Sequence, residues 1–201
     1  MRRLGSGLRS LRDPIQRCGL LVYRNLARLK RLLKMNLALN GCANVTATQI
    51  AASDRKGELE FVMNRANSGG SKRMPLVRDY KYFYDQPGIV KVQADRLDDV
   101  LADEEFQLIV MDIEGSEYFA LQGMQRLVSG AEHLVVEFLP HHLRNVARVS
   151  VREFLGLIQP HFDTLTIPSR DVTVARPQFL RTLEDMYQRD EGDDGLVFSK
   201  T

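Results

Sequence analysis

Four carboxylates stand at or near the ends of predicted strands. Asp54 follows one β-type segment, Asp112 and Glu114 directly follow a second, and Glu137 lies late in a third. Ligands of open parallel sheets bind beyond the carboxyl ends of the strands, so we predict that Asp54, Asp112 and Glu137 surround one crevice. Asp112 and Glu114 are two residues apart, and an extended backbone would point both to the same side. Convergent carboxylates suit a cationic ligand, a divalent metal ion or removal of a proton from a hydroxyl group.

Each of these acidic residues also has a structural interpretation. Asp and Glu often begin helices and occupy turns. Asp54 lies in a turn that contains a glycine, so its two interpretations carry equal weight. Helix capping would use only one of Asp112 and Glu114, which favours a functional role for that pair.

Two adjacent histidines, His141 and His142, follow the Glu137 segment. Imidazole titrates near neutral pH, so one of them could act as a general base or bind a substrate. A histidine pair without a function in a surface loop is the more common arrangement. No His/Cys spacing matches a zinc site, and no nucleophile elbow, phosphate-binding loop or Gly-x-Gly-x-x-Gly motif occurs.

Apolar patterns predict the elements that carry these groups. The nearly continuous apolar run 106–111 is typical of a parallel strand buried on both faces. Residues 133–138 predict another buried strand, and a helix between the two begins near Ser116 and stops at Ser129-Gly130. Further strands are predicted at 45–51, 59–63, 89–93, 164–167 and 196–199, and further helices at 97–101 and 151–157. Alternating strands and helices predict an α/β sheet with crossover helices on its faces.

Two segments differ from this alternation. Leu26, Leu29, Leu33 and Leu37 form one face of a predicted helix, which Asn40-Gly41 ends. Residues 64–88 show no clear periodicity, and we expect this segment to be either functional or disordered.

Charge is distributed unevenly along the chain. Residues 1–40 hold ten Lys or Arg and one acid, a net charge of +9, so the rest of the chain carries −7 of the overall +2. A solvated helix face is the first interpretation, and a basic arm for nucleic acid or an anionic membrane surface is the alternative. We predict a basic extension over 1–24 and a folded domain over 25–201. The first nineteen residues also fit an organellar presequence.

Composition excludes several protein classes. The chain has 201 residues, of which 44% are hydrophobic and 27% charged, as in a globular domain. Two cysteines cannot build a disulfide framework, which favours a reducing compartment, and we predict a cytoplasmic protein. No apolar run reaches the roughly 18–20 residues of a membrane-spanning helix.

Seven short motifs occur in a fixed order along the chain: Leu39-Asn40-Gly41, Asn44-Val45, Ala51-Ala52-Ser53-Asp54-Arg55-Lys56-Gly57, Leu97-Asp98-Asp99-Val100-Leu101, Met111-Asp112-Ile113-Glu114-Gly115-Ser116-Glu117, Ala120-Leu121-x-Gly123-Met124 and Glu137-Phe138-x-Pro140. As an ordered set they resemble the FkbM family of S-adenosylmethionine-dependent methyltransferases. The resemblance covers residues 25 to about 162, and the late segment 196–198 fits the family's last strand. It implies a Rossmann-like methyltransferase sheet, mostly parallel with one late antiparallel strand.

The resemblance also implies roles for individual residues. Ala52, Ser53 and Asp54 would lie beside the adenine of S-adenosylmethionine. Met111 and Asp112 would lie beside its methionine half, and Glu114 and Glu137 would face the methyl acceptor. A carboxylate complements the sulfonium charge and can take the acceptor's proton, so Asp112, Glu114 and Glu137 are the predicted catalytic residues. The expected acceptor is a hydroxyl group on a small molecule or glycan, and nucleic acid is not expected as a partner.

The beginning of the chain departs from the family pattern. Family members normally start with a strand and a Gly-rich turn for the cofactor, and a second strand then ends in an acid for the ribose. Residues 1–23 show neither, although Leu21-Val22-Tyr23 resembles a remnant of that second strand. A lysine common two positions before the motif aspartate is Val110 here. The expected protein is therefore an N-terminally truncated or late-started domain that lacks the first strand, binds the cofactor weakly or not at all, and tends to self-associate.

Two function classes remain open on the sequence alone. The first is an O-methyltransferase. The second is a non-catalytic methyltransferase-like binding or scaffold domain that uses the basic arm against an anionic surface. An in-frame strand and Gly-x-Gly segment upstream of Met1 in the DNA would favour the enzyme, whereas stop codons would favour the binding domain.

Overall fold

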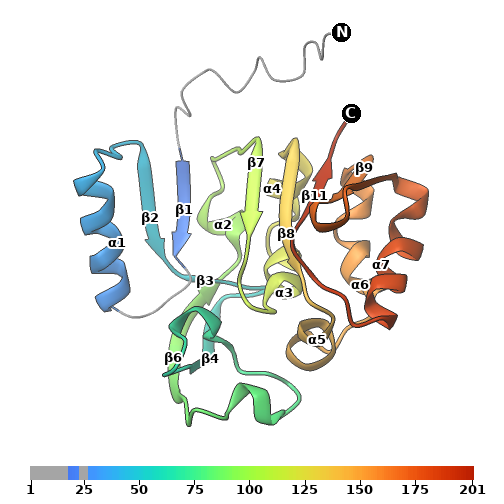
Figure 1. Ribbon diagram of the computed structural model, residues 1–201. Helices are drawn as coiled ribbons and strands as arrows, with labels where there is room; N and C mark the ends of the chain where they lie inside the picture. Colours follow the sequence, from blue (N-terminus) through green and yellow to red (C-terminus); the bar gives the residue numbers. More distant parts are fainter. Residues whose placement is uncertain (1–17, 23–26) are drawn as a thin grey trace, which may run out of the picture. The chain divides into compact units, whose positions relative to one another are not determined.

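The computed structural model describes residues 18–22 and 27–201, which fall in two compact units that divide between Ile50 and Ala51. The first unit contains two parallel strands, β1 (Cys18–Val22) and β2 (Val45–Gln49), connected by helix α1 (Ala27–Leu39) (Figure 1). The second unit holds the remaining elements, including every segment that carries a predicted site residue.

Helix α1 ends as its sequence predicts. Gly41 has a φ of +65°, and the N–H groups of Gly41 and Cys42 donate to the carbonyl oxygens of Ala38 (3.2 Å) and Leu37 (2.9 Å). These bonds satisfy carbonyls that the helix end would leave unpaired. Leu33 and Leu37 of the predicted apolar face are half-buried, and the other two leucines of that face lie outside the side chains that the structure describes.

A five-stranded sheet forms the larger part of the second unit, in the order β10-β9-β11-β8-β7. Strands β7 (Leu108–Met111) and β8 (His133–Phe138) are parallel neighbours, with Met111 opposite Val136. Strand β11 (Asp193–Ser199) is antiparallel to both β8 and β9 (Thr164–Ile167), between which it lies. Strand β10 (Val172–Ala175) pairs antiparallel with the outer side of β9.

A four-stranded sheet of order β3-β6-β4-β5 completes the second unit. Strand β3 (Ala51–Ala52) is parallel to β6 (Gly88–Asp95). Strand β4 (Gly57–Met63) is antiparallel to β6 along its whole length, and β5 (Lys72–Arg73) is antiparallel to β4. The Asp54-Arg55-Lys56-Gly57 turn therefore connects β3, which is parallel to β6, to β4, which is antiparallel to β6.

Six α-helices are described in the second unit, together with a π-helical turn. The helices are α2 (Leu97–Val100), α3 (Glu117–Gln122), α4 (Gln125–Gly130), α5 (Pro140–His142), α6 (Val151–Gly156) and α7 (Phe179–Gln188), and the turn is Leu143–Ala147. Fully buried phenylalanines form much of the core: Phe138, Phe154, Phe162, Phe179 and Phe198. This core lies around β8, β9 and β11, so the ends of these strands are held in fixed positions.

Strand β7 is less buried than its sequence predicts. The apolar run 106–111 is expected to be covered on both faces, but Leu108 is 53% exposed and Val110 is 66% exposed. Within the described residues β7 pairs with β8 alone, so it is an edge strand of the five-stranded sheet. An apolar run therefore does not by itself show that a strand is covered on both faces.

Two other predicted elements are divided in the structure. The segment 45–51 contains β2 and the start of β3, which belong to different sheets. The helix expected from Ser116 to Gly130 is two helices, α3 and α4, because the chain breaks at Gly123. A Cβ at Gly123 would lie 1.9 Å from the carbonyl oxygen of Ser53, so the close approach of this backbone to the end of β3 requires glycine.

The segment 64–88, which has no clear periodicity, is held by polar side chains. The Asp85 carboxylate accepts hydrogen bonds from the N–H groups of Arg65 (2.5 Å) and Ala66 (2.8 Å). Asp79 caps the short helical turn Tyr80–Tyr82 by accepting from the N–H of Lys81, and Tyr82 is buried. Local side-chain bonds to the backbone replace regular hydrophobic patterning here.

The observed architecture corrects the predicted fold class. The protein is α/β as predicted, but both larger sheets are mixed, with antiparallel pairs at β10, β11, β4 and β5 where a single late antiparallel strand was expected. Residues 1–17, which make up most of the segment that fits a presequence and most of the 1–24 extension, lie outside the described residues, and β1 falls within that extension. None of the described helices is both long and apolar enough to cross a membrane.

Candidate active site

The parallel pairing of β7 and β8 brings two predicted site residues to one edge of the sheet. Met111 lies opposite Val136, so Asp112 and Glu137 both stand at the carboxyl ends of neighbouring strands. Asp112 is exposed, whereas the Glu137 side chain is largely buried. The negative charge of Asp112 acts on Glu137 and contributes to its raised pKa.

Glu114 reaches the same region by a turned backbone. Its φ is +58° and that of Gly115 is +90°, so the chain is not extended there and the predicted extended alternation of Asp112 and Glu114 is wrong. A left-handed conformation costs a residue with a Cβ roughly 1–2 kcal/mol. A Cβ on Gly115 would lie 2.9 Å from Val146 and 3.0 Å from His142. Backbone strain of this kind is common at functional sites.

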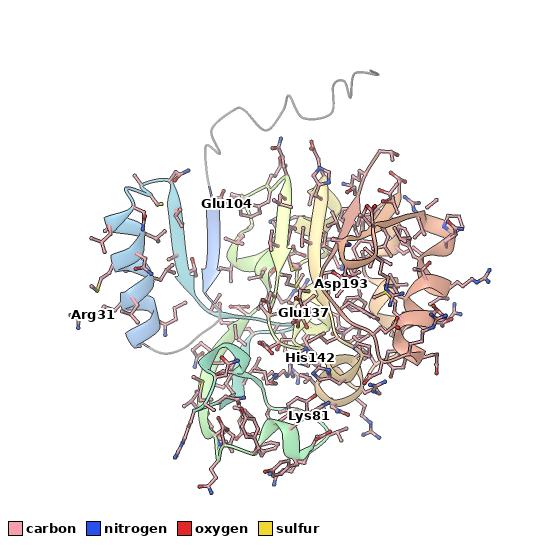
Figure 2. The ribbon with its side chains drawn as sticks, viewed as in Figure 1. Arg31, Lys81, Glu104, Glu137, His142 and Asp193 are labelled. Atoms are coloured by element: carbon pink, nitrogen blue, oxygen red, sulfur yellow. The ribbon has the colours of Figure 1, made fainter. Side chains whose placement is uncertain are left out.

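Four side chains form a connected polar cluster, which we call the relay cluster: Glu137, His142, Lys72 and Glu114. Glu137 Oε2 lies 3.2 Å from His142 Nδ1, and His142 Nε2 lies 3.3 Å from Lys72 Nζ. Lys72 Nζ donates to Glu114 Oε2 at 3.0 Å. Figure 2 shows the Glu137 and His142 side chains close together, where β8 leads into α5.

Burial and charge change the protonation of the relay cluster. Burial and the charge of Asp112 raise the pKa of Glu137 to about 7, and Lys72 opposes this rise. Burial and the charge of Lys72 lower the pKa of His142 to about 4, against the opposing effect of Glu114. His142 is therefore neutral near pH 7, whereas the Glu137 carboxyl titrates close to that pH.

Tyr82 connects the cluster to the 64–88 segment. Its hydroxyl donates to the carbonyl oxygen of His141 at 3.3 Å, and its ring lies 5.1 Å from Lys72 Nζ. Burial raises the pKa of Tyr82 to about 12, and burial together with His142 lowers the pKa of His141 to about 4. The side chains of Tyr82 and His141 are therefore both uncharged near pH 7.

The predicted cofactor-binding residues of the other sheet lie at the end of β3. Ala52 and Ser53 are buried, and the Ser53 hydroxyl donates to Asp54 Oδ1 at 2.9 Å. Asp54 Oδ1 also lies 4.0 Å from Nη1 of Arg73, which follows Lys72 on β5. Among the described residues, no hydrogen bond or ion pair joins Asp54 to Asp112 or Glu137. Met111, the remaining predicted contact, is buried at the end of β7.

Some residues of this site are missed by sequence reasoning. Lys72 and Tyr82 lie in the segment without periodicity, where no motif marks them. Glu117, in the first turn of α3, is buried and accepts a hydrogen bond from the N–H of Ile113 at 2.9 Å. His142 was one of two candidates in a pair, and its place five residues after Glu137 is the signal that could have selected it.

The described side chains do not suggest a metal centre. In the part of the chain that the structure describes, no three His, Cys, Asp or Glu side chains are arranged to hold a metal ion. The relay cluster contains one lysine among its four members, and an ammonium group supplies donors but no metal ligand.

The fold and the site together define a class of protein: α/β chains in which carboxylates gather at the ends of two parallel strands. The Methyltransferase FkbM domain family matches residues 13–161, well over half of the sequence, and the chain belongs to that family. No curated protein matches this chain.

One solved structure is similar to this chain. It is a crystal structure of Methyltransferase FkbM from Methylobacillus flagellatus KT, with 17% sequence identity and a TM-score of 0.47. The match covers 91% of this chain and 36% of that one, so the chain spans about a third of the length of that protein.

Proposed function

We propose that this protein transfers a methyl group from S-adenosylmethionine to a hydroxyl oxygen of a small molecule or glycan. Membership of the FkbM methyltransferase domain family supports methyl transfer. In this proposal β7, β8, β9 and β11 are part of a Rossmann-like methyltransferase sheet in which β11 is the late antiparallel strand.

The observation that carries the proposal is the gathering of Asp112, Glu114 and Glu137 around His142. Asp112 and Glu114 both act on the pKa of His142, and Asp112 acts on that of Glu137. When bound, S-adenosylmethionine would supply an electrophilic methyl group on a positively charged sulfur. Acidic side chains suit that charge, so the residues present at this sheet edge fit the group.

Each of the predicted residues has a proposed role. Asp112 and Met111 contact the methionine half, and Asp112 offsets the sulfonium charge. Glu114 and Glu137 face the acceptor, and a carboxyl group whose pKa lies near 7, as that of Glu137 does, is well matched to removing a hydroxyl proton at neutral pH. Ala52, Ser53 and Asp54 contact the adenine. Because methyl transfer is an in-line displacement, holding the two reacting atoms in place supplies much of the rate.

Two measurements test this function. Titration calorimetry with S-adenosylmethionine reports binding, and transfer of labelled methyl groups onto a panel of hydroxyl acceptors reports turnover. We expect Asp112→Asn to reduce turnover by about 10²–10³-fold, because a preorganised charge is lost, while urea unfolding stays cooperative because the side chain is exposed. Asp103→Asn, at an exposed position before β7, is the matched control and is expected to retain turnover.

The outcomes separate the enzyme from its alternative. Wild-type turnover in Asp112→Asn would contradict the assigned role of that residue. A wild type that shows no cofactor binding and no turnover would contradict the enzyme and would favour a non-catalytic binding or scaffold domain.

A further inference from the structure

Lys72 is a buried cation whose surroundings no sequence motif explains. Only 7% of its side chain is exposed, on the two-residue strand β5. Its Nζ lies 3.0 Å from Glu114 Oε2, 3.3 Å from His142 Nε2 and 5.1 Å from the centre of the Tyr82 ring. An ammonium group has three N–H donors, and the side chain thus has a carboxylate, an imidazole nitrogen and an aromatic ring around it.

This arrangement determines the tautomer of His142. An ammonium group can only donate, so the contact at Nε2 requires that nitrogen to accept and leaves the ring proton on Nδ1. Nδ1 then donates to Glu137 Oε2, which lies 3.2 Å away. This carboxyl oxygen can accept whether Glu137 is ionised or neutral. With only 4% of the His142 side chain exposed, water does not compete for either nitrogen.

We propose that Lys72 is a positioning residue of this site, which holds His142 as the Nδ1–H tautomer and holds the Glu114 carboxylate at its strained turn. The tautomer makes His142 a donor to Glu137, and the hydrogen bond from Lys72 occupies the lone pair of Nε2, so that nitrogen does not act as a base. The consequence for methyl transfer rests on the proposed function: the acceptor's proton is left to a carboxylate, while the imidazole orients Glu137. The tautomer itself does not depend on any activity.

Charged and titratable groups face His142 from several elements. Glu114 and Asp112 come from the end of β7, Glu137 from β8, Lys72 from β5 and Lys81 from the Tyr80–Tyr82 turn, and His141 precedes it on α5. Lys72 and Lys81 disfavour the imidazolium, whereas Glu114 and Asp112 favour it. Removing the Lys72 charge leaves Glu114 Oε2 only 3.8 Å from Nε2, so protonated His142 would then take the place of the ammonium group.

The test is histidine NMR on the full-length protein without cofactor. Nitrogen-15 shifts of His142, assigned by their loss in His142→Asn, report its tautomer, and a pH titration reports its pKa. In Lys72→Met we expect the Nδ1–H tautomer to lose its dominance and the pKa to rise from about 4 toward the ordinary 6.5. Lys72→Arg keeps a charged donor and is expected to retain both wild-type properties.

Lys81→Met is the matched control. Lys81 Nζ lies 5.3 Å from the centre of the same Tyr82 ring, and its charge also lowers the pKa of His142. Its ion-pair partner, however, is Asp79, with Nζ 4.0 Å from Oδ2, and its side chain is 42% exposed. We expect a smaller rise of the pKa and an unchanged tautomer. An unchanged tautomer and pKa in Lys72→Met, or equal changes in Lys81→Met, would overturn the proposal.

A second variant covers a failure of Lys72→Met to fold. Lys72→Gln keeps a neutral donor in the cluster, so we expect the tautomer to stay and the pKa of His142 to rise; a pKa unchanged in Lys72→Gln would also overturn the proposal. In an active enzyme, Lys72→Met is further expected to move the pH–rate profile to higher pH, because Lys72 opposes the raised pKa of Glu137. An inactive wild type with the expected NMR result would contradict the proposed function and leave the role of Lys72 intact.

Discussion

Glu117 places a carboxyl group in the protein interior next to the relay cluster. It is buried at the start of α3 and accepts a hydrogen bond from the N–H of Ile113. Burial raises its pKa from 4.5 to about 8, and the nearby carboxylates of Glu137 and Asp112 add to the rise. The folded state therefore keeps a proton that the unfolded state loses between about pH 4.5 and 8.

This proton makes the stability of the protein depend on pH. Because the folded state binds more protons in that interval, the free energy of unfolding falls as the pH rises from 4.5 to 8, by on the order of 4 kcal/mol from Glu117. In Glu117→Gln an amide oxygen still accepts from Ile113, and no carboxyl titrates. We expect the variant to lose this part of the pH dependence and to be more stable than the wild type above about pH 8.

Urea unfolding at about pH 5 and about pH 9 measures the difference. Glu105→Gln, at an exposed position before β7, is the control and is expected to keep the wild-type pH dependence. Equal pH dependence in wild type and Glu117→Gln would contradict the raised pKa.

At this scale the sequence identifies acids better than their partners. Asp112, Glu114 and Glu137 follow or end apolar runs, so strand prediction is enough to place them near one sheet edge. Lys72 reaches them from a strand of only two residues, which has no detectable period. Its contact with Glu114 spans 42 positions of sequence and depends on how the two sheets pack, which no local pattern records.

The turn between β7 and α3 shows how an element positions the site. Gly115 has a φ of +90°, and a Cβ there would meet the Val146 side chain at 2.9 Å. Gly115→Ala is expected to destabilise the protein by about 2–4 kcal/mol, because a left-handed alanine is strained and its methyl group overpacks the Leu143–Ala147 turn. It is also expected to displace Glu114 and so reduce any turnover.

Chemical denaturation of Gly115→Ala and of Gly130→Ala measures this effect. Gly130 ends α4, and a Cβ there meets nothing within 4 Å, so its replacement is expected to be neutral or stabilising by up to about 1 kcal/mol. Similar stability of the two variants would contradict the steric role of Gly115.

Element prediction succeeds where a pattern is local. Strands β8 and β9 have the predicted bounds, and α6 ends one residue from its predicted end; its first turn carries a capping box of Ser150 and Glu153. The helix after Ser116 is predicted as one piece, because its break at Gly123 accompanies a close contact with Ser53, which follows the distant strand β3. Tertiary contacts of this kind are absent from the local sequence.

The whole molecule is less parallel than the family resemblance implies. Strands β7 and β8 are parallel, but β10, β4 and β5 add antiparallel pairs beyond the expected β11. The segment 64–88 contributes β5, whose pairing with β4 holds Lys72 in the candidate site. The chain thus places a functional side chain on an element that sequence patterns do not predict.

The β7 edge of the five-stranded sheet leads to a prediction for the molecule in solution. Strand β7 has β8 as its one partner among the described strands, and Leu108 and Val110 point exposed apolar side chains from the same face. An apolar edge strand is a common site of association between copies of a chain. We expect the wild type to self-associate at micromolar concentrations, and Val110→Lys to reduce its apparent mass in light scattering.

Because Val110 is 66% exposed, the substitution is expected to change the free energy of unfolding by less than about 0.5 kcal/mol. Val172→Lys, on the opposite edge strand β10, adds the same charge and serves as the control. A monomeric wild type, or equal effects of the two lysines, would show that the β7 edge does not drive association.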